Sequence, residues 1–283
     1  MAGLKSGEGK ASADLHVHTN ASDGTESPRQ VVYRARKLGL QAIAITDHDT
    51  LEGIIPALEA GRAVSLEVLP GIELSTEYKD TEVHLLGYLI DLNHRGFLAH
   101  LDGVRQDRKE RALKMVNKLR QMGIPITSEQ VFSVAGGGTV GRPHVARVLI
   151  EMGFVQSIAQ AFERYIGSGG PAYVPRFKYS PLQAVHMIRS AGGVPVLAHP
   201  GLGSSDALIP QLVDEGLQGL EVYYPGHSSR VIEHYLGFCH YYNLIFTGGS
   251  DYHGPEHKNY GSLGTVTVPY SVVQDLKARA KKR

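Results

Sequence analysis

The chain has 283 residues, 42% of them hydrophobic and 20% charged, a composition typical of a globular protein and not of a disordered or fibrous one. Its 29 basic and 28 acidic residues leave a formal net charge of +1. This balance excludes a strongly basic, chain-wide footprint, so no stable binding of duplex DNA is expected. No apolar run reaches the ~18 residues of a membrane span, and no interaction with a membrane is expected.

Two further features concern the compartment. Residues 1–13 are rich in Gly, Ser and Lys and lack the apolar segment of a secretory signal. The single cysteine, Cys239, cannot form an internal disulfide. Both features predict a reducing, cytoplasmic setting.

In chain order, seven short apolar segments predict β-strands, and helical patterns separate several of them. The segments span 14–18, 42–46, 66–74, 83–89, 194–198, 220–223 and 244–247. The first helix is signalled by Ser27 and Pro28 at its start and by Gly39 at its end. Alternation of this kind predicts an α/β protein with a mostly parallel sheet, and seven strands favour a barrel over an open sheet.

The alternation stops between residues 98 and 175, where no strand is predicted. Four helices are expected instead, over 98–122, 128–134, 142–152 and 157–166. We therefore expect a discontinuous barrel domain, 1–97 and 176–283, interrupted by a helical insertion at 98–175 that forms a lid over the substrate.

His16 and His18 are separated by one residue, a spacing that places both imidazoles on one face of a strand. Such a pair suits a metal ion, although two hydrogen-bonded histidines would show the same spacing. The pair does not stand alone, because most predicted strands end in His, Asp or Glu: Asp23, Asp47, His48, Asp49, Glu73, His84, His199, Asp251 and His253. If the strands share a register, these groups converge at the carboxyl-terminal mouth of a barrel.

In order and spacing, these residues resemble the four motifs of the PHP (polymerase and histidinol phosphatase) family. The matching positions are His16-Val17-His18 with Asp23, Thr46-Asp47-His48, Gly71-Ile72-Glu73 with His84, His199, and Asp251-Tyr252-His253. The resemblance spans about residues 14–253. It implies a distorted seven-stranded β/α barrel, two to three divalent metal ions and phosphoesterase activity.

The resemblance also implies how the ligands divide among the metals. His16, His18, Glu73 and Asp251 would hold one ion. Glu73 would bridge to a second ion that His84 and His199 also hold. Asp23, His48 and His253 would hold the third.

The donor atoms agree with this interpretation independently. All nine candidate ligands are imidazoles or carboxylates, and Cys239 lies outside every motif. Sites of this kind suit Mn²⁺, Zn²⁺ or Fe²⁺, of which we favour Mn²⁺ because the site is rich in carboxylates. Closely spaced ions would lower the pKa of a bridging water, and the resulting hydroxide would attack phosphorus.

Candidate substrate-binding residues come from the insertion and its edges. Arg142 and His144 flank Pro143, which presets the first turn of a helix whose amino terminus favours phosphate. Lys178 follows the insertion, and His227 follows another strand. We expect Arg142 and His227 to act in catalysis and all four to bind substrate, with a structural role for His227 as an equal alternative.

The insertion resembles one PHP branch, the nucleoside 3′,5′-bisphosphate phosphatases and 5′→3′ exoribonucleases of short RNA. The partner would be a nucleotide or short oligonucleotide. A phosphatase of a small metabolite such as histidinol phosphate is the alternative. The complete set of nine ligands argues against a non-catalytic metal-binding module. The low net charge and the absence of Trp argue against a purely nucleic-acid-binding protein. No predicted strand ends in a Lys, which argues against a metal-dependent amidohydrolase. The oligomeric state is left open.

Overall fold

The computed structural model describes residues 12–79, 81–136, 140–175, 179–203, 206–255 and 261–281. Its strands are β1 (Ser12–Val17), β2 (Ala42–Ile45), β3 (Glu67–Tyr78), β4 (Thr81–Tyr88), β5 (Val194–Leu197), β6 (Gly219–Tyr223), β7 (Ile245–Gly248) and β8 (Val268–Pro269). The α-helices are α1 (Pro28–Lys37), α2 (Ile54–Val64), α3 (Arg95–Gln121), α4 (Ser128–Ala135), α5 (Arg142–Glu151), α6 (Ile158–Ala161), α7 (Pro181–Ser190), α8 (Ile209–Glu215), α9 (Ser229–Tyr242) and α10 (Tyr270–Lys281).

The strands form one eight-stranded sheet that is nearly closed into a barrel. Their order is β7-β6-β5-β4-β3-β2-β1-β8. A parallel bridge between Val17 and Tyr252, with a hydrogen bond from the His18 N–H to the Tyr252 carbonyl at 2.8 Å, joins β1 to the segment after β7. The predicted α/β barrel is confirmed, with one short strand more than the seven expected.

The pairing departs from a regular parallel barrel at β4 and at the short β8, which pairs antiparallel with β1. β1–β2–β3 and β5–β6–β7 pair in parallel, but β4 is antiparallel to both β3 and β5. The cause is a hairpin: β3 continues to Tyr78 instead of ending near Leu74, and β4 returns directly from Thr81. The predicted end of the third strand at Glu73 was therefore wrong.

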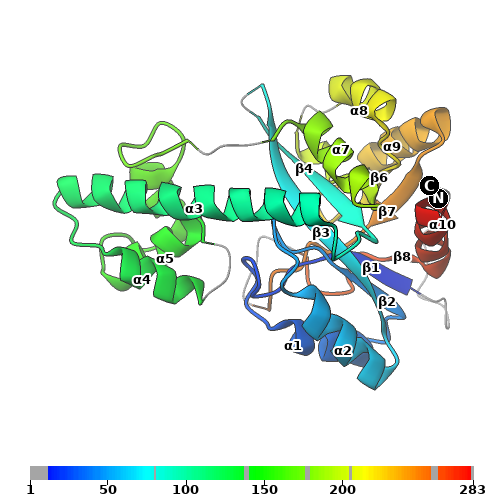
Figure 1. Cartoon of the computed structure of the whole chain (residues 1–283), viewed down its shortest axis with the longest axis horizontal. Coiled ribbons are helices and arrows are strands. Elements are labelled where there is room, and N and C mark those ends of the chain that lie inside the picture. Colours follow the sequence, from blue (N-terminus) through cyan, green and yellow to red (C-terminus); the bar gives the residue numbers. More distant parts are fainter. Residues whose placement is uncertain are drawn as a thin grey trace.

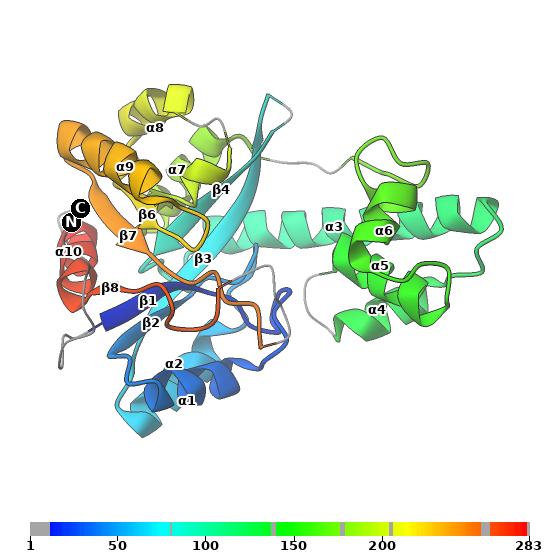
Figure 2. The same cartoon turned by 180° about the vertical axis from the view of Figure 1, so that it is seen from behind.

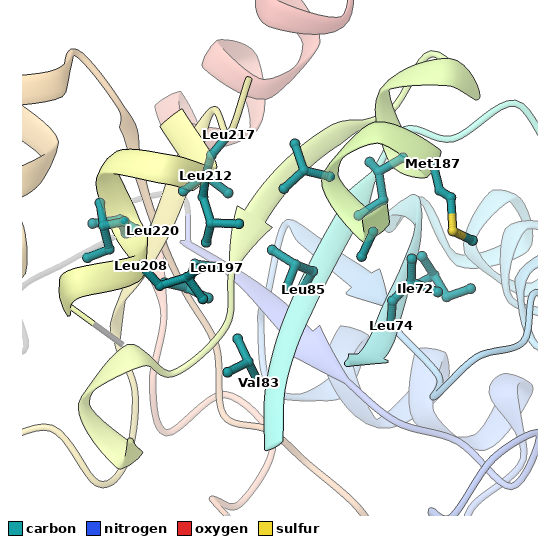
Figure 3. Close-up of a cluster of buried hydrophobic side chains, with 14 of the residues drawn as sticks. Ile72, Leu74, Val83, Leu85, Met187, Leu197, Leu208, Leu212, Leu217 and Leu220 are labelled. Carbon is teal, nitrogen blue, oxygen red and sulfur yellow. The ribbon is translucent and has the colours of Figure 1, made fainter. Parts of the chain in front are cut away.

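Helices cover the barrel on its outside. α1 and α2 lie against the β1–β3 side, whereas α7, α8 and α9 cover the β4–β7 side (Figure 1). Beneath α7 and α8, buried leucines of the strands pack against Met187 and Leu212 (Figure 3). No described helix combines the length and the apolarity that a membrane crossing requires.

The insertion packs around its own hydrophobic core. α3 leaves the barrel as one long helix, and α4, α5 and α6 gather at its far end (Figures 1 and 2). Phe97 and Leu101, in its first turns, belong to the barrel core, whereas Met115 and Leu119 belong to the core of the insertion. The boundary expected at residue 98 thus lies inside a continuous helix, and the described part of 98–175 contains no strand.

The separate cores lead to a first prediction. Leu149→Ala, a truncation in the fully buried centre of the insertion core, should lower the local unfolding free energy by about 2–5 kcal/mol. Native-state hydrogen exchange should then show lost protection in α4 and α5, with protection of β2 and β3 retained. Equal loss in the barrel strands would contradict two separate cores.

Candidate metal centre

All nine predicted ligands meet at one end of the barrel. His16 and His18 lie at the end of β1, His48 directly after β2, and Asp23 in the loop that follows β1. Glu73 and His84 come from the β3–β4 hairpin, His199 follows β5, and Asp251 and His253 follow β7. Three overlapping groups of these side chains bring potential ligand atoms within 4.8 Å of one another.

The first group consists of His16, His18, Glu73 and Asp251. Nε2 of His16 and Nε2 of His18 lie 3.0 Å apart, and each is 3.1 Å from Oε2 of Glu73. Asp251 Oδ1 lies 3.3 Å from His16 Nε2 and 3.2 Å from His18 Nε2. Two ring nitrogens and two carboxylate oxygens thus face one point, which is the arrangement a metal ion needs.

One of the other groups joins Asp23, His48 and His253 to His18, and the other joins His48 and His84 to Glu73. Asp23 lies 3.3 Å from Nε2 of His253 and 3.9 Å from Nε2 of His48. Oε1 of Glu73 is 2.8 Å from His84 Nδ1 and 3.1 Å from His199 Nε2. Because its two oxygens face different histidines, Glu73 would be a ligand shared by both ions if two were bound here.

The charges of the cluster fit divalent cations. Burial lowers the pKa of His18, but hydrogen bonds to Asp251 and Glu73 outweigh burial and raise that pKa to about 10. Burial raises the pKa of Glu73, yet the surrounding histidines, led by His48, hold it well below its usual range. The carboxylates therefore favour positive charge among these rings.

Unpaired ring nitrogens support the same fit. Nδ1 of His18 and Nδ1 of His48 are buried and have no hydrogen-bond partner among the described residues. Buried polar atoms are rarely left unpaired without a ligand or water. A nitrogen–oxygen donor set without sulfur suits Mn²⁺, Fe²⁺ or Zn²⁺.

Glu221, on β6, supports this centre and was missed in the sequence. Nδ1–H of His16 donates to Glu221 Oε1 at 2.9 Å, which leaves Nε2 unprotonated and directed at the cluster. The other oxygen, Oε2, accepts the N–H of His199 at 2.8 Å. The signal available in the sequence was an acidic residue between Leu220 and Val222 of a predicted strand, and the structure buries it fully.

Tyr224 and Asp47 form further supports around the centre. The hydroxyl of Tyr224 donates to Asp251 Oδ2 at 3.0 Å. Asp47 accepts the N–H of Thr19 at 2.7 Å and the hydroxyls of Thr19 and Ser22 at 2.8 and 2.7 Å. Asp47 therefore anchors the loop that carries Asp23.

The insertion reaches the centre through His144 and Arg108. A small cavity of about 40 Å³ is lined by Ser22, Asp23, His48, Arg108, Gly141, Pro143 and His144. His144 Nδ1 accepts the Gly141 N–H at 3.0 Å, and burial together with Arg147 lowers the His144 pKa. Neutral His144 therefore keeps an Nε2–H to donate.

Arg108, on α3, was also missed, because its helix resembles a solvated charged surface in the sequence. It pairs with Asp49 and is largely buried, with its Nε unpaired among the described residues. Arg142 does not line the cavity; its guanidinium lies 4.9 Å from the centre of the Phe162 ring. Lys178 lies outside the described residues.

His227 makes two hydrogen bonds to the main chain. Its Nδ1–H donates to the Val222 carbonyl at 2.8 Å, and its Nε2 accepts the Gly201 N–H at 3.2 Å. Burial also lowers its pKa, which stabilises the neutral form that this pattern requires. This arrangement favours the structural alternative for His227.

The Glu221 support can be tested directly. Glu221→Gln should reduce metal affinity roughly 10- to 100-fold, since the amide weakens the bond that orients His16. Competition with a fluorescent chelator measures the affinity. The matched control is Glu67→Gln, on β3 of the same sheet, which removes an ion pair with Lys277 of α10. Equal affinity in both variants would contradict the role of Glu221.

Comparisons with known proteins agree with this geometry. The family model described as the PHP domain matches residues 14–170. The chain is 34% identical over 249 residues to the 5′-3′ exoribonuclease Rnm of Escherichia coli (strain K12), spanning 86% of this chain and 85% of that one. It is 32% identical over 251 residues to the 3′,5′-nucleoside bisphosphate phosphatase of Chromobacterium violaceum, spanning 87% and 88%.

A solved structure is similar over nearly its whole length. It is that of a Bifidobacterium adolescentis protein assigned as a metal-dependent phosphoesterase, with a TM-score of 0.86 and 33% identity over 94% of this chain and 96% of that one. The chain therefore belongs to the PHP family and is a hydrolase that acts on phosphoester bonds.

Proposed function

We propose that this hydrolase acts on nucleotides, removing a phosphate from a nucleoside 3′,5′-bisphosphate or cleaving nucleotides from the 5′ end of short oligoribonucleotides. The observation that carries the proposal is the position of Glu73. Its two oxygens face separate histidine groups, and the neighbouring His48 lines a cavity to which the insertion contributes Arg108 and His144. The named activities of the exoribonuclease and the bisphosphate phosphatase relatives support this choice of substrates.

The nine clustered side chains would hold two or three divalent ions, with Mn²⁺ the proposed ion and Zn²⁺ or Fe²⁺ the alternatives. Bound there, such ions supply Lewis-acid charge and activate a water for attack on phosphorus. Glu221 keeps His16 in the tautomer that presents Nε2. Tyr224 holds the carboxylate of Asp251 in place through its hydroxyl.

The insertion is the proposed lid, and its charge suits an anionic substrate. Residues 98–175 contain 10 Lys and Arg against 6 Asp and Glu, a net charge of +4. The rest of the chain contains 19 against 22, a net charge of −3. Arg108 and His144 therefore present positive charge and a proton donor beside ligands of the metal centre, where a second phosphate would bind.

The bridging role of Glu73 yields a metal-content prediction. Wild-type protein should bind more than one equivalent of a first-row metal, whereas Glu73→Gln should lose at least one equivalent and nearly all activity, because the amide cannot bridge. Elemental analysis after reconstitution provides the count. Glu77→Gln on the same strand should keep both properties. Full activity in Glu73→Gln would overturn the assignment.

A second prediction separates the two arginines. Arg108→Ala should lower kcat/KM on a nucleoside 3′,5′-bisphosphate by roughly 30- to 150-fold, the equivalent of ~2–3 kcal/mol for a charge-assisted hydrogen bond. Arg142→Ala should lower kcat/KM less, because the Arg142 guanidinium lies over the Phe162 ring and does not line the cavity. The measurement is the steady-state kcat/KM of each variant on two substrates, the bisphosphate and p-nitrophenyl phosphate.

The controls distinguish substrate binding from folding. Arg108→Lys keeps the charge but not the planar fork, so it should recover activity only in part. The simple ester has no second phosphate, and its turnover should change little in Arg108→Ala. An equal drop on both substrates would place Arg108 at the reacting phosphate or in the structural pair with Asp49.

A further inference from the structure

A second, larger cavity borders the metal centre and shares no lining residue with the small cavity beside Arg108. Its volume is about 410 Å³, and His84 and His199 form part of its wall. The β3–β4 hairpin contributes Tyr78 and Val83, and the chain from β5 onward contributes Leu197, Leu202 and Leu208. We call this cavity the apolar pocket. Its volume lies within the ~300–1,000 Å³ range of small-molecule sites.

The walls of the apolar pocket suit a flat, weakly polar group. Val83, Leu197 and Leu208 are buried, and Tyr78 adds an aromatic ring at the side. Leu202 is 59% exposed at the opening, a large apolar side chain placed where a ligand would cover it. Lys79 at the rim lies 5.1 Å from the centre of the Tyr78 ring.

The two cavities flank one continuous row of histidines. His48 lines the small cavity with Arg108, whereas His84 and His199 line the apolar pocket. The ring centres of His48 and His84 are 5.1 Å apart, and those of His84 and His199 are 5.2 Å apart. A cationic cavity and an apolar one thus share the metal centre as their common wall.

We propose that the apolar pocket binds the nucleoside part of the substrate, with the base between Tyr78 and Leu202. This inference rests on the proposed function and adds a determinant of specificity to it. The scissile phosphate would lie over the histidine row, and the second phosphate would bind near Arg108. Stacking on side chains tolerates every base, so the pocket would favour nucleotides over phosphate esters that lack a base without selecting one particular base.

The test uses two variants at the exposed edge of the pocket. Ala207→Trp fills it from the rim, and Leu202→Glu places a charge on its apolar wall. Each should raise KM for adenosine 3′,5′-bisphosphate about tenfold or more. Activity on ribose 5-phosphate, which lacks a base, should stay within about twofold of wild type.

Matched controls place the same side chains elsewhere. Leu38 is 55% exposed at the end of α1, and Ala278 is exposed on α10, so Leu38→Glu and Ala278→Trp should leave both substrates unaffected. A readout independent of turnover is the quenching of 2-aminopurine riboside fluorescence, which needs no phosphate chemistry. Wild-type protein should quench it saturably, and the two pocket variants should not.

The outcomes separate the pocket from the function. Nucleotide hydrolysis that neither pocket variant alters would overturn the pocket and leave the nucleotide activity standing. If metal-loaded wild type hydrolysed no nucleotide, the proposed function would fail. Saturable riboside binding that Leu202→Glu abolishes would still support the pocket. The pocket would also be overturned if the two pocket variants lost as much activity on ribose 5-phosphate as on the bisphosphate.

Discussion

The carboxylate of Glu73 is the constraint around which the site is built. It is only 1% exposed, and it faces His16 and His18 with one oxygen and His84 and His199 with the other. A buried carboxylate is costly unless positive charge or hydrogen bonds compensate it. The barrel meets this requirement by placing four histidines, located on or directly after β1, β4 and β5, against the Glu73 carboxylate on β3. The antiparallel hairpin is what makes this possible, because it places Ser75 opposite His84 and so brings the imidazole of His84 beside Glu73.

Backbone conformation turns the other groups toward the same point. Asp49, His199 and Asp251 follow β2, β5 and β7, and each has a positive φ, of 53°, 26° and 52°. Non-glycine residues in this region cost of order 1–3 kcal/mol each and concentrate at functional sites. Here they let a straight strand end in a sharp turn, which directs the side chains of His199 and Asp251 to the metal centre and the side chain of Asp49 to Arg108. Hydrogen bonds to Glu221, Ser75 and Tyr224 hold the three turns in place.

The sequence predicted most of the strands and helices, because each of these has a local pattern that recurs along the chain. The seven main strands and the insertion helices were predicted within a few residues, since apolar runs and caps such as Ser27 are local signals. The hairpin was not predicted, because the same apolar run fits a strand in either direction. β8 was missed because Val268–Pro269 is too short to show a pattern. Glu221 and Arg108 were missed for opposite reasons. One is hidden in an apolar strand, and the other resembles a solvated charge on a polar helix.

Arg108 lies on α3, the helix that connects the barrel core to the core of the insertion. α3 is anchored in the barrel core at Phe97 and Leu101 and in the insertion core at Met115 and Leu119. Arg108 lies between these anchors and pairs with Asp49, the residue next to His48. A rigid helix held at both ends fixes this side chain more precisely than a loop would. The metal ligands and the groups that the insertion brings to the small cavity are therefore carried by two separate cores that this helix joins. In the proposed function, metal binding then depends on the barrel ligands, whereas the choice of substrate depends on Arg108 and His144 of the insertion together with the apolar pocket of the barrel.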